Sequence, residues 1–212
     1  MKRGRKKVTD PDTARRILEA AERHFAAHGL AGARTDQIAI SAHANKAMLY
    51  YYFGDKRRLH RAVLENIIRE FRLRFEEAVP RTATPRQRIL SFVDAYFDFR
   101  ANQPRYPQIM MWLMMSEPTE ARWLARTHIV PAHRLLQRFI KEGIACGEFR
   151  KVDPKQMVIT LIGMIALYFS SSVVHSEILG KNAFSPNAVA ERKRAVVDFL
   201  EHGLFLPEKR RA

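Results

Sequence analysis

The chain has a single cysteine, Cys146, among its 212 residues, so it forms no intramolecular disulfide. A scaffold held by disulfide bonds is therefore excluded, and a reducing cytoplasm fits best. The basic segment 2–7 is followed by Val8-Thr9-Asp10-Pro11 rather than by the apolar stretch of a secretory signal. We expect a cytoplasmic protein.

The motifs of common catalytic and metal sites are also missing. The eight histidines do not fall into metal-ligand spacing with Cys146 or with carboxylates, and no glycine-rich phosphate loop or nucleophile elbow occurs. We therefore expect no enzymatic activity, no metal site and no cofactor.

Acidic residues are few relative to basic ones. There are 22 Asp and Glu against 37 Lys and Arg, a formal net charge of +15. Residues 1–60 alone hold thirteen basic and six acidic residues, a net charge of +7. This excess points to a polyanionic partner, either nucleic acid or an anionic membrane surface.

No segment alternates as a strand does, and no internal repeat is present. Apolar residues recur at helical spacing instead, which predicts an all-α fold. Caps, prolines and glycines divide the chain into nine expected helices, three short and six longer. Thr35, Asn45 and Asp55 are expected to begin the second, third and fourth of them as caps, and Thr84-Pro85 to open the fifth. We expect a kink at Pro131. The expected helices cover about residues 10–29, 35–42, 45–52, 55–79, 84–103, 107–116, 118–143, 153–179 and 185–206.

The two short helices 35–42 and 45–52 are separated by a turn of about three residues. This spacing is typical of a helix-turn-helix, in which the first helix braces the second in a major groove. Ala39 and Ala42 are small enough for a close helix crossing. The apolar residues expected to hold the pair against the first helix are Ile17, Phe25, Ile38, Leu49 and Phe53.

Helix 45–52 carries three consecutive tyrosines, more than a small core needs. Their hydroxyls suit phosphate oxygens, and their rings suit sugar edges and thymine methyl groups. The alternative is that the tyrosines fill the junction with the next helix, and this applies most to Tyr50. On the first interpretation, the outward-facing residues are Lys46, Ala47, Met48, Tyr50 and Tyr51.

This part of the chain resembles the DNA-binding domain of the TetR/AcrR family. The matching residues are Arg16–Ala21, Phe25–Gly29, Thr35, Ile38-Ala39 and Asn45–Lys56. The resemblance implies a homodimer that binds double-stranded operator DNA and a small effector. It further implies that Thr35, Tyr52 and Lys56 contact phosphates. By the same resemblance, Lys46, Ala47, Tyr50 and Tyr51 lie at the groove.

The sequence departs from the family pattern at four places. Tyr52 stands where the family often has His, and its hydroxyl can still donate to a phosphate. His43 replaces the usual turn glycine, so we expect a left-handed backbone there. Ala47-Met48 replaces a common Gly-Thr pair, which leaves the operator sequence open. Arg57 and Arg58 replace residues that are often acidic, and each opposes the helix dipole by about 0.3–1 kcal/mol. Either DNA phosphates offset this cost or both arginines are simply solvated.

The region 71–139 is rich in large, soft side chains that suit an apolar ligand between helices. Each of them alone is more often a core residue, and the family resemblance is what favours a pocket. The candidate pocket residues are Phe71, Phe75, Phe92, Tyr96, Phe99, Met110, Met111, Trp112, Met114, Met115, Trp123 and His128.

Residues 157–174 carry no charge, and the length of this uncharged run reaches the lower bound for a membrane span. Internal Thr160 and three serines, helix caps, and flanking polar residues argue against a span and for a buried dimer interface. The family dimerises through its last two helices. The candidate interface residues are Val158, Leu161, Ile162, Ile165, Phe169, Val196, Phe199 and Leu200.

Together these observations predict a basic arm at 1–9, a helix-turn-helix domain at 10–55, a ligand-binding and dimerisation domain at 56–207, and a tail at 208–212. We expect a repressor released from an inverted-repeat operator by an apolar or amphipathic effector that shifts the helix 56–79. The arm either contacts DNA or only aids solubility. The alternatives are a DNA-coating protein without sequence preference and a membrane-associated helical protein.

Overall fold

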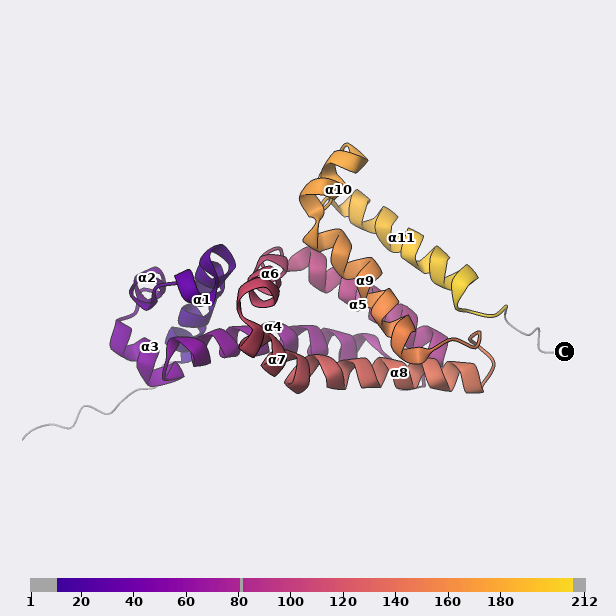
Figure 1. Cartoon of the computed structure of the whole chain (residues 1–212), viewed down its shortest axis with the longest axis horizontal. Helices are drawn as coiled ribbons and strands as arrows, with labels where there is room; N and C mark the ends of the chain where they lie inside the picture. Colours follow the sequence, from indigo (N-terminus) through magenta and orange to yellow (C-terminus); the bar gives the residue numbers. More distant parts are fainter. Residues whose placement is uncertain (1–10, 81, 208–212) are drawn as a thin grey trace, which may run out of the picture.

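The computed structural model describes residues 11–80 and 82–207, and over these residues the fold is all-α, as predicted (Figure 1). The only extended pairing among them is one isolated antiparallel bridge between Phe149 and Phe205. The basic arm and the tail expected at the two ends lie outside the described residues.

The N-terminal helices are α1 (Pro11–Gly32), α2 (Thr35–Ser41) and α3 (Lys46–Phe53). Asn45 caps α3 as predicted, because its side chain accepts a hydrogen bond from the Met48 amide at 2.8 Å. Thr35 was expected to cap α2, but Arg34 holds that position and makes no side-chain cap. Helix α1 continues past Gly29, where φ of 64° and ψ of −178° kink it.

Helix α4 (Lys56–Ala78) begins at the Asp55 cap and runs from α1–α3 along the molecule (Figure 1). It is followed by α5 (Pro85–Asn102), α6 (Tyr106–Ser116) and α7 (Pro118–Leu124). A capping box at Thr84 starts α5, as the Thr-Pro pair indicated.

The irregularity expected at Pro131 is a π-helical segment, Ala125–Ile129, that joins α7 to α8 (Val130–Ala145). The Val130 amide bonds to the Ala125 carbonyl, five residues back. Proline has no N–H and its ring crowds the carbonyl four residues earlier, so the turn before it widens.

The expected helix 153–179 is two helices, α9 (Pro154–Ser170) and α10 (Ser172–Leu179), bent by 80° at Ser171. Over the described ranges no single helix has the length and apolar character to cross a membrane, and this bent pair meets those criteria only when taken together. Helix α11 (Pro186–Gly203) is the last. The nine expected segments are thus all helical, with two further breaks.

Two hydrophobic clusters hold the molecule together. One surrounds Phe25 and Leu49 and extends beyond residue 55 into α4–α7, to Leu113 and Leu124. The other surrounds Phe97 and Phe169 and is built from α4, α5, α8, α9 and α11. The two clusters share α4 and α5, so a displacement of either helix acts on both ends of the molecule.

Candidate DNA-binding, ligand and dimer sites

The outer surface of α3 is the solvent-exposed part of the helix-turn-helix. Lys46, Ala47, Tyr50 and Tyr51 are exposed there, while Leu49 is fully buried against α1. The Lys46 ammonium lies 6.0 Å from the centre of the Tyr50 ring. The surface therefore combines a cation, two phenols and a small residue on one rigid helix.

The three tyrosines of α3 are not equally exposed. Tyr52, not Tyr50, is partly buried and packs with Phe53 against the N-terminal core, and Met48 is partly buried there too. The Tyr50 hydroxyl lies 3.2 Å from the Thr35 hydroxyl, which ties α3 to the start of α2.

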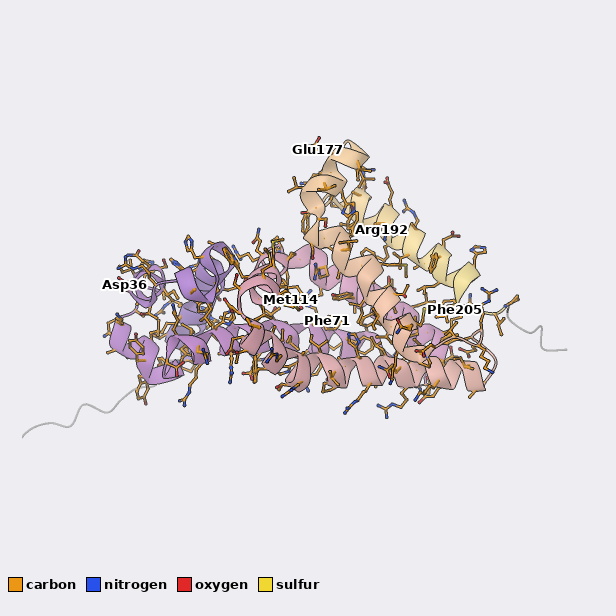
Figure 2. The ribbon with its side chains drawn as sticks, in the orientation of Figure 1. Asp36, Phe71, Met114, Glu177, Arg192 and Phe205 are labelled. Atoms are coloured by element: carbon orange, nitrogen blue, oxygen red, sulfur yellow. The ribbon has the colours of Figure 1, made fainter. Side chains whose placement is uncertain are left out.

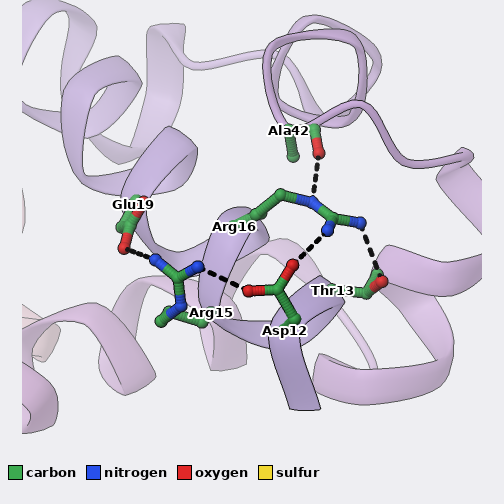
Figure 3. Close-up of polar contacts among 6 residues, drawn as sticks. All are labelled: Asp12, Thr13, Arg15, Arg16, Glu19 and Ala42. Atoms are coloured by element: carbon green, nitrogen blue, oxygen red, sulfur yellow. Dashed lines mark hydrogen bonds and ion pairs between the residues drawn. The ribbon is translucent and has the colours of Figure 1, made fainter. Parts of the chain in front are cut away.

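The turn between α2 and α3 has the left-handed residue that the sequence predicted, His43, with φ of 50°. Arg16 of α1 braces this turn by donating from Nε to the Ala42 carbonyl at 3.2 Å (Figure 3). Asp12 pairs with Arg16 and holds its guanidinium in place. In the sequence, Arg16 stands out only as part of the resemblance to the family. Its bracing role depends on the three-dimensional fold, which the sequence does not display.

The basic residues at the start of α4 already have partners within the subunit. Lys56 donates to the carbonyls of Ala31 and Ala33 at 3.2 and 3.1 Å. Arg57 lies 3.4 Å from the buried Glu120 carboxylate, and Arg58 lies 3.5 Å from Asp55. These contacts offset part of the dipole cost that had been assigned to DNA phosphates or to water. Arg57 and Arg58 remain exposed on the side of the helix-turn-helix.

A buried polar junction, formed by His60 of α4 with Glu117 and Glu120 at the start of α7, connects α1, α4 and α7. Glu117 accepts from the Leu30 amide at 2.6 Å, and Glu120 accepts two hydrogen bonds from Arg61. The His60 ring packs edge-on against Phe25, and its Nε2 lies 3.8 Å from Glu117. Burial lowers the pKa of His60 to about 4 and raises the pKa of Glu117.

His60 makes folding stability sensitive to mild acid. An unfolded histidine takes up a proton near pH 6.5, whereas folded His60 takes one only near pH 4, so stability falls as pH drops between these values. We expect urea denaturation to give an unfolding free energy about 2 kcal/mol lower at pH 5 than at pH 7 from this group. The raised pKa of Glu117 acts in the opposite direction. His60→Gln isolates the histidine, and an unchanged pH slope in that variant would contradict the assignment.

A cavity of about 460 Å³ lies between α4, α5, α6, α8 and α9, in the range of small-molecule sites. Phe71 and Met114, both in its wall, lie in the middle of the molecule (Figure 2). Eight of the twelve candidate pocket residues line it: Phe71, Phe92, Tyr96, Phe99, Met110, Met111, Met114 and His128. The residues not expected there are Ile68, Arg100, Tyr106, Pro107, Ile129, Ala132, His133, Leu136, Ile162, Ala166 and Ser170.

Four candidate pocket residues lie elsewhere. Phe75 packs behind Phe71 in the core, and Trp123 lies under the Arg61 guanidinium at 4.7 Å. Trp112 donates to the Ala26 carbonyl at 3.1 Å, and Met115 is exposed to solvent. Their helices were correctly predicted, but on each helix they point to another side.

Arg100 is the pocket residue that sequence reasoning most clearly missed. Its side chain is 2 % exposed and lines the cavity from α5. The available signal was its place four residues after Tyr96, on the same helical face. A cation on an apolar, aromatic face is rare enough to deserve a functional hypothesis.

Six of the eight residues predicted for the dimer interface are instead buried inside their own subunit, so that prediction is wrong for them. They fill the core between α5, α8, α9 and α11, where no partner side chain reaches: Val158, Leu161, Ile165, Phe169, Val196 and Leu200. Ile162 lines the cavity, and only Phe199 is well exposed, at 52 %.

The opposite side of α9 is apolar and exposed. Ile159, Gly163 and Leu167 follow at four-residue spacing and form one stripe. Phe199 lies seven residues after Arg192, which donates to the Met164 carbonyl of α9, so Phe199 is on the side of α11 that faces α9 (Figure 2 shows Arg192). We call Ile159, Gly163, Leu167 and Phe199 the α9–α11 face.

Helix α6 contacts both the cavity and α1. Its Met110, Met111 and Met114 line the cavity. On the same helix, Trp112 packs on Gly29 of α1 and hydrogen-bonds to α1. Helix α6 therefore connects the cavity wall directly to α1 at the DNA-binding end. No group of three or more potential metal ligands occurs within residues 11–80 and 82–207.

Two family models match the chain. The model for bacterial regulatory proteins of the tetR family matches residues 17–63, and a tetracyclin repressor-like C-terminal domain matches residues 79–210. The HTH-type transcriptional repressor SCO4008 of Streptomyces coelicolor is 38 % identical over 49 % of this chain and 50 % of its own length. NicS, a repressor of Pseudomonas putida, is 30 % identical over 63 % and 64 %. The chain thus spans less than two thirds of either relative.

Solved structures share the fold over nearly the whole chain. A protein from Saccharomonospora viridis, assigned as a transcriptional regulator and crystallised with choline, covers 93 % of this chain and 100 % of its own, with a TM-score of 0.73 and 21 % identity. The ketosteroid regulator KstR2 of Mycobacterium tuberculosis covers 95 % and 98 %, with a TM-score of 0.70 and 18 % identity. At these identities the likeness concerns the fold. Because the C-terminal family model alone covers more than half of the chain, the chain belongs to the TetR family of bacterial regulatory proteins.

Proposed function

We propose that this regulator is a homodimeric repressor that binds an inverted-repeat operator in the cytoplasm and is released by a small, largely apolar effector. The exposed surface of α3, with Lys46, Tyr50 and Tyr51 on a rigid helix-turn-helix, is the observation that carries the proposal. Two such helices, held a fixed distance apart, fit half-sites about one helical turn apart or a multiple of that.

This proposal assigns different roles to the two parts of the chain. Residues 10–55 contact DNA, and residues 56–207 bind the effector and the second subunit. Lys46, Ala47, Met48, Tyr50 and Tyr51 approach the groove or its walls. Thr35, Tyr52, Lys56, Arg57 and Arg58 contact or attract backbone phosphates, with Lys56 exchanging the carbonyls of Ala31 and Ala33 for a phosphate oxygen.

Effector binding releases the operator by changing the relative position of the two DNA-binding ends. A guest in the cavity presses on α6 and α4, and both helices contact α1. Only an effector with higher affinity for the non-binding arrangement shifts the equilibrium in this direction.

Selection of bound duplexes from a random pool tests the proposal. A repressor of this kind recovers an inverted repeat that it prefers over random duplex by about a thousandfold or more. A DNA-coating protein held by charge alone recovers no common sequence, and that outcome would reject the proposal.

Lys46→Ala is expected to weaken binding to the selected operator by about tenfold, because one cation at the groove is lost from each subunit. The slope of log affinity against log salt concentration should become shallower if Lys46 contacts a phosphate. Lys141→Ala, at an exposed lysine on α8, removes the same charge far from α3 and is the matched control. Equal affinities for the two variants in a mobility-shift titration would contradict this placement.

A further inference from the structure

Arg100 is a buried cation without a matching anion. It donates from Nη2 to the Ala166 carbonyl and to the Ser170 hydroxyl, each at 3.1 Å. Its Nε is buried and has no hydrogen-bond partner, and no carboxylate of residues 11–80 and 82–207 is in ion-pair contact with it. A buried guanidinium in this state is destabilising unless something else completes its hydrogen bonds.

The cavity wall supplies no negative charge either. None of its lining residues is Asp or Glu. The guanidinium carbon lies 5.9 and 5.1 Å from the rings of Tyr96 and Tyr106. Burial raises the pKa of both phenols, so both stay neutral at physiological pH. The rest of the wall is aromatic and aliphatic apart from Ser170 and two histidines, His128 and His133.

We propose that the effector is an amphipathic carboxylic acid whose carboxylate pairs with Arg100 while its apolar body lies against Phe71, Phe92 and Met110. This inference rests on the proposed function of the cavity as the effector site. Guanidinium and carboxylate match in planar geometry and form the strongest class of protein hydrogen bonds. Ser170, already bonded to Arg100, lies beside the same group.

A cationic ligand is the main competitor, because aromatic cavities also bind quaternary ammonium groups. In this chain, however, the Arg100 guanidinium already lies beside Tyr96, Tyr106 and Phe169. A second cation in that position meets like charge with no carboxylate in the wall to balance it. The charge of the cavity therefore selects against it.

Calorimetric titration of the full-length protein without DNA tests the proposal directly. The probes are octanoate and 4-phenylbutyrate, each compared with its primary amide and with a trimethylammonium compound of the same skeleton. We expect each carboxylate to bind about tenfold tighter than its amide, or more, and the trimethylammonium compounds to bind weakest. Stronger binding of an amide or an ammonium compound, or no binding of either carboxylate at millimolar concentration, would overturn the proposal.

Arg100→Met removes the charge and keeps a long side chain. In this variant we expect carboxylate and amide to bind equally, and the ligand-free protein to melt at the same temperature or higher, because an unpaired buried cation is gone. A carboxylate preference that survives the substitution would assign the selectivity elsewhere. If the variant fails to fold, Arg100→Lys, which keeps the charge without the planar fork, should retain only part of the preference. Operator release is measured separately: a carboxylate that binds through Arg100 without releasing DNA contradicts the repressor mechanism and leaves the Arg100 site standing.

Discussion

Leu167→Glu is expected to convert the regulator into monomers and to lower operator affinity by about a hundredfold or more. The reason is that a second helix-turn-helix linked in the same dimer raises the affinity for DNA by about 10²–10⁴. We place the interface of the proposed dimer on the α9–α11 face, so that this apolar surface meets its own copy. A two-fold interface places each Leu167 close to equivalent surface of the partner, so two carboxylates enter one apolar contact. Light scattering gives the mass, and a mobility-shift titration gives the affinity.

The subunit itself should tolerate this change. Leu167 is 62 % exposed, so the glutamate does not enter the subunit core and the helical circular dichroism should be retained. Met115→Glu, at a 78 % exposed methionine of α6, introduces the same charge away from the α9–α11 face and should leave the dimer intact. A Leu167→Glu protein that remains dimeric with full operator affinity would place the interface on another surface. The exposed apolar residues of α10, Val173 and Ile178, would then be the next candidates.

The elements that sequence reasoning predicted well are those fixed by local chemistry. Asn45 and Asp55 cap their helices because a short polar side chain satisfies free amides wherever it precedes a helix. His43 takes the left-handed conformation because the turn geometry requires it. The helix bend at Ser171 was missed, since no proline or glycine marks it and the apolar pattern continues through it.

The direction of each apolar face was harder to predict. Val158, Leu161 and Ile165 have the spacing of an interface, but the same spacing serves a subunit core, and here the core takes them. The stripe of Ile159 and Leu167 on the other side of α9 carries the same kind of residue. Because α9 is apolar all round, helix periodicity alone does not tell which of its sides faces the subunit core. Only the packing of α5, α8 and α11 decides this.

Gly29→Ala is expected to lower the free energy of unfolding by about 3 kcal/mol through two separate effects. The backbone at Gly29 has φ of 64° and ψ of −178°, a region that is essentially restricted to glycine. In addition, an added Cβ would lie 3.0 Å from the Trp112 ring. The ring is held by its hydrogen bond to Ala26, so it cannot move away freely. Denaturant unfolding measures the loss.

Two further variants separate the backbone effect from the contact. Gly180→Ala, in the left-handed helical region with φ of 62° and ψ of 22° and with nothing within 4 Å of an added Cβ, should lose only the backbone cost of that less restricted region, about 1–2 kcal/mol. Trp112→Leu removes the ring. In the double variant, Gly29→Ala should then lower the free energy of unfolding only by the cost of the strained backbone. Full additivity of the two changes would mean that the ring exerts no constraint at Gly29. A coupling between them would instead establish that α6, which lines the cavity, is held against α1 at the one residue where α1 bends.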